Sequence, residues 1–193
     1  MARLTVRSLA VAACATIALL ATGQAAAESW RSTGDANDLV FATAYDGQPL
    51  EGRFRQFEVR VETEDRVEAM PATLAVSVDV ASADMNDRDL NETLASPDWF
   101  DSAANRAASF TSDTIEQDAA NHFVAAGTLE LKGVSAPATV DFSWSADDDR
   151  AKLSGTAQLS RSTWSIGEGE WAGEDHIPDT VKLRFTVNLA PRN

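Results

Sequence analysis

Residues 180–189 read TVKLRFTVNL, and this stretch decides the fold class because apolar and polar side chains alternate along its whole length. Every second residue from Val181 to Leu189 is apolar, and the residues between them are Lys, Arg, Thr and Asn. A period of two places all the apolar side chains on one face of an extended strand. Such a strand separates water from an apolar interior.

The same alternation recurs at close spacing along the chain, with turn residues between the segments. We expect about eight strands, near residues 38–45, 51–62, 74–80, 108–112, 123–131, 140–144, 153–159 and 180–189. Residues 132–137 are interpreted as a turn, and Gly52 indicates a bend near the start of the second strand. The pattern predicts an all-β fold, either an antiparallel sandwich or an up-and-down barrel.

One helical stretch interrupts the strands. Asn86 or Asp87 can cap its first turn, and Leu90 and Leu94 share one helical face. A second short turn at residues 96–100 follows, with serine and proline at its start and two aromatic side chains, Trp99 and Phe100. Two large aromatic side chains beside the mouth or edge of a barrel usually plug the core. We therefore expect them to fill the core rather than to contact a ligand directly.

The N-terminal segment has the pattern of a secretory signal peptide. Arg3 and Arg7 precede an apolar run at residues 9–21, and residues 25–27 are three alanines suited to signal peptidase. The sequence therefore predicts a leader over residues 1–27 and one exported domain over residues 28–193. Cys14, the only cysteine, would leave with the leader, so the mature chain would have no disulfide.

The charge of the chain disfavours several classes of partner. The formal net charge is −14, and removal of two leader arginines makes the mature chain more acidic still. Nucleic acid and anionic membrane surfaces are repelled by such a surface. No segment after the leader has the roughly 20 apolar residues of a membrane helix.

Catalytic and metal-binding patterns are not found in the sequence. His122 and His176 are the only histidines, and both are expected at the surface. No histidine or cysteine pair has the spacing of a zinc site. Residues 167–172 mimic a dinucleotide fingerprint, but two glutamates there would repel a pyrophosphate. We therefore predict no enzymatic activity, no cofactor and no metal.

The interior is expected to contain either a cavity or the inserted helix. Several inward positions on neighbouring strands carry small residues, which leave volume that large side chains elsewhere do not fill. These positions are Ala108, Ala125, Gly127, Gly155 and Ala157. A barrel of about eight strands can enclose one small ligand.

Four groups of residues, taken in order, resemble the YceI-like family. Residues 52–57 follow its G-x-F-x-x-F segment, and residues 88–110 follow its R-D…L-x-S-x-D-F-F-D…A-x-F run. Residues 127–137 resemble its G-x-L-x-x-x-G-V-x-x-P hairpin, and residues 179–183 resemble its closing D-x-V-x-L strand. Arg106-Ala107 replaces the proline that is usual before A-x-F, and residues 167–171 resemble a shorter branch of the family.

The resemblance implies a lipocalin-like antiparallel barrel, exported to the periplasm, with a hydrophobic tunnel for polyisoprenoids, quinones or fatty-acyl amphiphiles. Burial of such a tail removes a cost of about 0.8 kcal/mol for each exposed methylene. We expect the tunnel to be lined by the inward rows together with Tyr45 and Trp164, which are also candidates to bond a polar head group at a mouth. The expected lining residues are Phe41, Tyr45, Phe57, Val76, Val78, Phe110, Phe123, Phe142, Trp144, Trp164, Val181, Leu183 and Phe185.

Two other functions stay open at the level of sequence. One is a protein-interaction module with a packed core and an acidic surface, and the other is a hydrolase acting on an apolar substrate. A homodimer and a transient contact with a membrane protein are also left open. A cavity inside the barrel is the feature that separates a carrier from an interaction module.

Overall fold

Strand β11 (Thr180–Pro191), which has the clearest alternation, closes the barrel. One edge of β11 pairs with β10 over ten residues, and the other edge pairs with β2 and then with β1.

The computed structural model describes residues 27–34, 36–64 and 70–192. The predicted leader therefore lies outside the described residues, apart from Ala27 at its end. The other strands are β1 (Glu28–Ser32), β2 (Asp38–Tyr45), β3 (Gln48–Phe54), β4 (Phe57–Thr63), β5 (Pro71–Asp79), β6 (Ala83–Asp84), β7 (Ala107–Ala119), β8 (His122–Leu131), β9 (Val134–Ala146) and β10 (Ala151–Ser160).

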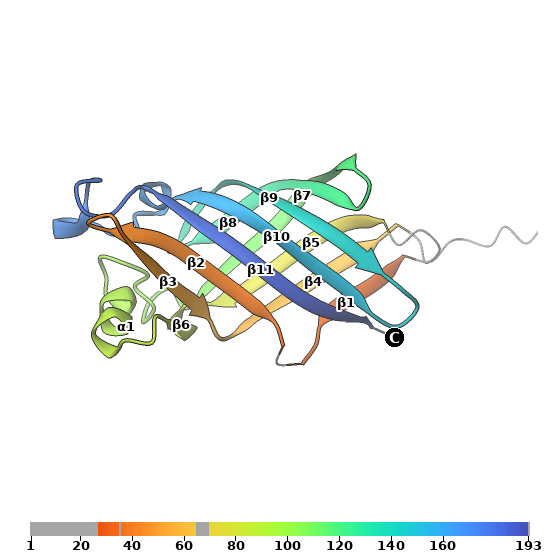
Figure 1. Cartoon of the computed structure of the whole chain (residues 1–193), viewed down its shortest axis with the longest axis horizontal. Helices are drawn as coiled ribbons and strands as arrows, with labels where there is room; N and C mark the ends of the chain where they lie inside the picture. Colours follow the sequence, from red (N-terminus) through yellow and green to blue (C-terminus); the bar gives the residue numbers. More distant parts are fainter. Residues whose placement is uncertain (1–26, 35, 65–69, 193) are drawn as a thin grey trace, which may run out of the picture.

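Antiparallel pairing runs around a ring in the order β1, β4, β5, β7, β8, β9, β10 and β11. The pairing of β1 with β11 completes the ring, so the fold is a closed eight-stranded barrel, as predicted. Strands β2, β3 and β6 extend the wall beyond β11 at the end that carries α1 (Figure 1). Closure removes the free edges that an open sheet would have, although residues 134–139 of β9 pair only with β8.

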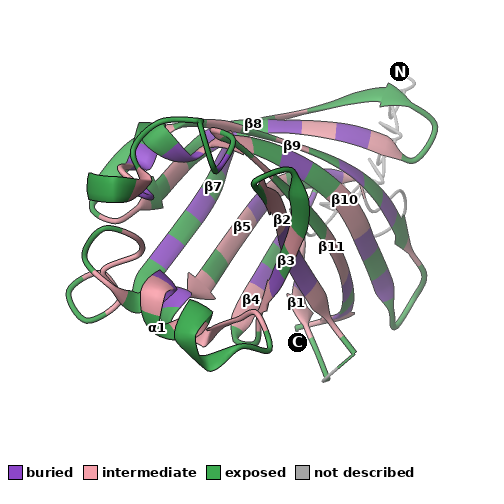
Figure 2. Cartoon of the chain, turned by 60° about the vertical axis from the view of Figure 1, so that its left-hand side comes forward, coloured by how far each residue is buried: buried purple, intermediate pink, exposed green. Residues whose placement is uncertain are grey.

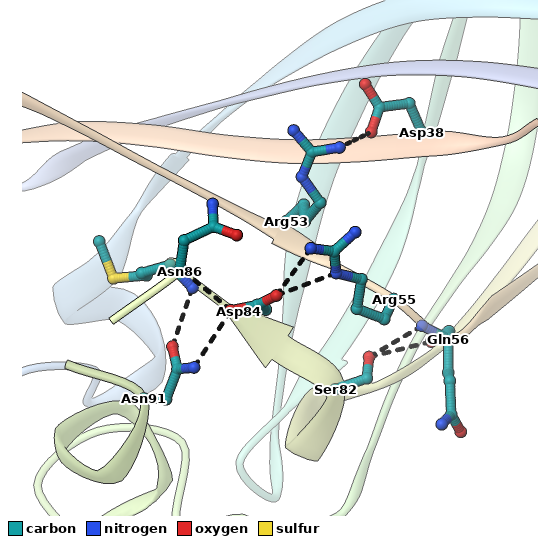
Figure 3. Close-up of polar contacts among 9 residues, drawn as sticks. Asp38, Arg53, Arg55, Gln56, Ser82, Asp84, Asn86 and Asn91 are labelled. Carbon is teal, nitrogen blue, oxygen red and sulfur yellow. Dashed lines mark hydrogen bonds and ion pairs between the residues drawn. The ribbon is translucent and has the colours of Figure 1, made fainter. Parts of the chain in front are cut away.

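The strand predicted over residues 51–62 is two strands with different neighbours. β3 pairs with β2 and β6, whereas β4 pairs with β1 and β5. At the break, the backbone N–H of Arg55 donates to the Ser82 carbonyl at 3.1 Å. The backbone N–H of Gln56 donates to Ser82 Oγ at 3.0 Å (Figure 3). Ser82 therefore satisfies the backbone groups that the bend frees.

Asp84 holds the short strand β6 against this bend. Its carboxylate accepts two hydrogen bonds from the Arg55 guanidinium, at 3.0 and 2.7 Å (Figure 3). It also accepts from the backbone of Asn86 at 2.8 Å and from the Asn91 side chain at 3.1 Å. These donors, Arg55 first, lower the pKa of Asp84 to about 2.

Helix α1 (Arg88–Ala95) begins where its capping residue predicts. The Asp87 side chain accepts from the backbone N–H groups of Asp89 and Leu90, at 2.9 and 3.0 Å. Leu94 is buried on the inner face, whereas Leu90 remains 36% exposed. The helix thus lies across one end of the barrel with only part of its apolar face covered.

The predicted turn at residues 132–137 is shorter than expected. Strand β9 resumes at Val134, so that Lys132 and Gly133 alone form the turn, both with positive φ. Two positive φ angles are typical of a two-residue hairpin turn. Pro137 lies inside β9, in the part that pairs only with β8, where a missing N–H is tolerated.

Two glycines that the sequence suggests as sources of empty space have a different role. A Cβ on Gly127 would lie 2.1 Å from the Thr111 carbonyl oxygen, and one on Gly155 would lie 2.1 Å from that of Asp141. Both positions therefore allow close approach of neighbouring backbones in a strongly curved wall. Of the five small inward residues named from the sequence, only Ala108 and Ala157 line a cavity.

The end of the barrel opposite α1 is filled by aromatic side chains. Trp30 and Trp144 meet edge to face with centroids 5.8 Å apart, and Phe123 stacks on Phe142 at 5.5 Å. All four are at most 4% exposed and belong to the largest apolar cluster of the described chain. We call these four residues the floor.

Candidate ligand-binding cavity

Two adjoining cavities occupy the part of the barrel above the floor. The larger has a volume of about 460 Å³ and lies at the end that carries α1, and the smaller, of about 100 Å³, lies deeper. Six residues line both: Leu39, Val78, Ala108, Leu129, Leu159 and Leu183. Protein interiors are otherwise close-packed, with few voids larger than a water molecule. The packed interior expected of a pure interaction module is therefore not what this chain forms.

The cavity wall comes from the inward-facing residues of the strands. In the first half of β7, over residues 107–112, buried and exposed residues alternate as bands, which Figure 2 shows from the α1 end. The inward residues Ala108 and Phe110 line the smaller cavity. On the opposite wall, Leu183 and Phe185 of β11 do the same. The period of two therefore positions the wall on both sides.

The structure brings together ten of the thirteen side chains expected from sequence. These ten line one or both cavities: Phe41, Tyr45, Phe57, Val76, Val78, Phe110, Trp164, Val181, Leu183 and Phe185. The other three, Phe123, Phe142 and Trp144, line neither cavity and form part of the floor. Alternation shows that a side chain points inward, but it does not show whether that level of the barrel is filled.

The two residues expected to bond a head group differ in position. Trp164 is 2% exposed, and its indole N–H donates to the Leu129 carbonyl at 3.2 Å, so that donor is already used. Tyr45 is 41% exposed at the mouth, where its ring lies near Trp171 and stacks on His176. Of these two residues, only Tyr45 is exposed to solvent.

Several lining residues come from segments in which strand periodicity gives no signal. Trp99 and Phe100, expected to plug the core, lie in the wall of the larger cavity. Trp171 and Ile177 reach it from the connection between β10 and β11. Large apolar side chains in otherwise polar loops are the one sequence signal that points to them. Their inward position depends on how the loop folds back over the barrel.

Residues 161–179 form a lid over the larger cavity, and Arg161 organises it. The guanidinium of Arg161 is buried and donates to six backbone carbonyls at 2.5–3.3 Å. These carbonyls belong to Ile166, Gly167, Trp171, Gly173, Ile177 and Pro178. One side chain thus fixes the path of the whole segment.

Asp179 and His176 anchor the lid to its surroundings. Asp179 accepts from Ser160 Oγ and, at 2.9 Å, from the Ser162 backbone, and these bonds lower its pKa. His176 Nδ1 lies 2.7 Å from the Asp46 carboxylate in the turn between β2 and β3. The hydrogen bond and charge of Asp46 raise the pKa of His176.

The histidines and acidic side chains of the described residues form no metal-binding cluster. No three histidine, cysteine or acidic side chains of the described residues lie close enough together to hold a metal ion. Each histidine contacts a single aspartate at the surface, His122 with Asp118 and His176 with Asp46. Among the described residues, no helix is both long and apolar enough to cross a bilayer.

Comparison with known proteins agrees with this architecture. A family model described as the YceI-like domain matches residues 30–189. BcnA of Burkholderia cenocepacia has the same fold, with a TM-score of 0.72 and 27% identity over 79% of this chain and 95% of that one. No curated protein matches the sequence.

Two more distant structures share the fold alone. A polyisoprenoid binding domain from Saccharophagus degradans, implicated in plant cell wall breakdown, has a TM-score of 0.64 and 15% identity over 84% of this chain and 98% of that one. The YceI protein of Campylobacter jejuni also has a TM-score of 0.64, with 18% identity over 75% of this chain and 86% of that one.

Proposed function

The chain belongs to the YceI-like family, and from that membership and its apolar cavity we propose an exported binding protein that sequesters or carries a long apolar ligand. The ligand is a polyisoprenoid, quinone or acyl amphiphile whose tail enters the barrel. The name of the S. degradans domain, which is a polyisoprenoid binding domain, supports this class of tail. The leader-like segment at residues 1–27 supports export to the periplasm.

The observation that carries the proposal is the larger cavity. Its volume of about 460 Å³ falls within the range of about 300–1,000 Å³ that is typical of small-molecule sites. Its wall is built mainly from aliphatic and aromatic side chains, and the smaller cavity continues it toward the floor. Transfer of a tail from water into this space is favourable by about 0.8 kcal/mol per methylene. Binding of this kind needs no catalytic group.

The floor sets how far a tail can enter. Trp30, Phe123, Phe142 and Trp144 fill the barrel opposite the lid, so the tail enters from the lid end and stops above these rings. A ligand longer than the two cavities would leave its remaining length outside the barrel.

Binding can be tested with the mature protein, residues 28–193. Solvent extraction of the purified protein followed by mass spectrometry identifies any lipid that copurifies. Titration with prenols and quinones, followed by tryptophan fluorescence, then measures affinity, since Trp99, Trp164 and Trp171 line the cavity. Absence of both a copurified lipid and any binding would contradict the proposal.

A matched pair of variants shows where the ligand binds. Val78 lines both cavities, so Val78→Phe fills part of the space and is expected to weaken binding at least about tenfold. Val134, 37% exposed, lies outside both cavities, and Val134→Phe is expected to leave binding unchanged. Equal affinities for the two variants, both folded, would place the ligand elsewhere.

A further inference from the structure

The larger cavity has a single charged residue among those that line it, and that residue has no donor to spare. Arg161 contributes its five N–H groups to six backbone carbonyls of the lid. A phosphate or carboxylate in the cavity could bind Arg161 only by displacing these carbonyls. The carbonyls would then be left without partners, and the lid would lose the contacts that fix its path.

The segments around the mouth carry mostly negative charge. Residues 165–179 of the lid contain five acidic residues and no lysine or arginine. Residues 86–105, which include α1, contain five acidic residues and one arginine, Arg88, which bonds Glu92 at 2.8 Å. Three positively charged or titratable side chains near these segments are engaged: Lys132 with Ser165 O and Glu168, His176 with Asp46, and Arg55 with Asp84.

Two polar atoms in the lining residues have no partner in the described structure. The hydroxyl oxygen of Thr43 and the indole nitrogen of Trp99 are buried without a hydrogen bond. Both groups are uncharged and both can donate to an oxygen acceptor. Neither atom is accessible from the cavity, so the surface that a ligand would meet is apolar. Such a surface offers nothing to balance a full negative charge that has been removed from water.

From these three observations we infer that the site selects an amphiphile with an uncharged head group and discriminates against phosphate and carboxylate heads. The inference rests on the proposed function and narrows its ligand class. Selection arises in two places. Inside, a charged head would lose its hydration without gaining a cation. Outside, the acidic segments around the mouth, residues 86–105 and 165–179, which we call the rim, repel it.

The test compares two ligands with the same tail, farnesol and farnesyl monophosphate. Both are titrated into the mature protein at about pH 8, with tryptophan fluorescence as the readout, at about 50 mM and about 500 mM NaCl. Farnesol is expected to bind at least about tenfold more tightly at low salt, and the ratio is expected to shrink at high salt as the rim is screened. If farnesyl monophosphate binds as tightly as farnesol, or more tightly, the inference is overturned while the proposed function stays intact. If neither ligand binds, the proposed function itself fails, and this inference with it.

A pair of charge variants tests the role of the rim. Glu170→Gln combined with Glu174→Gln removes two exposed lid charges and is expected to narrow the low-salt ratio by about threefold, with farnesol affinity unchanged. Asp148→Asn combined with Asp149→Asn removes two exposed charges from the β9–β10 turn at the other end of the barrel (Figure 1). This control is expected to leave the ratio as it is. If the ratio of farnesol affinity to farnesyl monophosphate affinity is the same in the two double variants, the rim has no role in selection.

Discussion

The imidazole of His176 lies 2.7 Å from the carboxylate of Asp46, a residue 130 positions earlier in the chain, and this contact joins the lid to the turn between β2 and β3. The Asp46 backbone N–H also donates to the His176 carbonyl at 2.9 Å. Tyr45, next to Asp46, stacks on the His176 ring at the mouth of the larger cavity. The lid is therefore linked to the barrel wall at the point where a ligand would enter.

This link should depend on pH. Asp46, and to a lesser degree Asp175, raise the pKa of His176 above its ordinary value of 6.5. A raised pKa means that the contact stabilises the folded state fully below about pH 6.5 and loses this effect as pH rises through the folded-state pKa. NMR titration of the His176 ring should give a pKa above 6.5, and hydrogen exchange of the lid should quicken with pH beyond the intrinsic rate.

Asp46→Asn provides the control for this prediction. Asparagine tolerates the positive φ of 47° found at this position and can keep a neutral hydrogen bond. The pKa of His176 should fall toward 6.5 in this variant. A His176 pKa that is the same with and without the Asp46 charge would contradict the prediction.

Arg161→Lys should loosen the lid and destabilise the protein. An ammonium has three N–H donors and cannot reach the six carbonyls that the guanidinium bonds. We expect a loss of about 2–4 kcal/mol in the free energy of unfolding, because buried carbonyls lose their partners. Denaturant unfolding measures this loss, and limited proteolysis should show new cleavage within residues 161–179.

Arg184→Lys is the matched control for Arg161. Arg184 is exposed and contacts Glu51 at 3.2–3.3 Å on the outer wall. Its replacement should change the free energy of unfolding by less than about 0.5 kcal/mol. Comparable losses for the two variants would show that the carbonyl contacts of Arg161 have no special importance.

Substitutions in the floor and in the cavity wall should separate stability from binding. Phe142 is 1% exposed and stacked on Phe123, so Phe142→Ala should cost about 3–5 kcal/mol in the free energy of unfolding. Leu183 borders both cavities and is only partly buried. Leu183→Ala should cost less than Phe142→Ala, while it weakens binding of a farnesol tail. Denaturant unfolding and fluorescence titration of both variants decide this, and the reverse order of stability costs would refute it.

Gly155→Ala should destabilise the barrel although it adds a single methyl group. The added Cβ would lie 2.1 Å from the Asp141 carbonyl oxygen and 2.7 Å from the Phe185 ring, so backbone must move. We expect a cost of about 1–3 kcal/mol or more. Thr156→Ala, on the exposed face next to it, should cost clearly less in the same unfolding experiment. If Gly155→Ala leaves the free energy of unfolding unchanged, strands β9 and β10 can move apart at this point without cost.

The sequence by itself determined the class of fold and the wall of the barrel. Strict alternation in residues 180–189 and in the other segments placed Leu183, Phe185 and Val78 facing inward, because a strand has only two faces. The start of the helix was indicated by Asn86 or Asp87 for an equally local reason, since either side chain can satisfy free N–H groups of the first turn. The structure shows that Asp87 is the cap.

Only the tertiary structure decided which inward residues border empty space. Phe110 and Phe142 have the same local pattern, yet the first lines a cavity and the second lies in the floor. The position of Trp171 in the wall depends on Arg161, which holds the lid in place through contacts with carbonyls that carry no sequence signal. Packing and the path of a loop depend on contacts between residues far apart along the chain. A sequence pattern within one segment therefore cannot predict them.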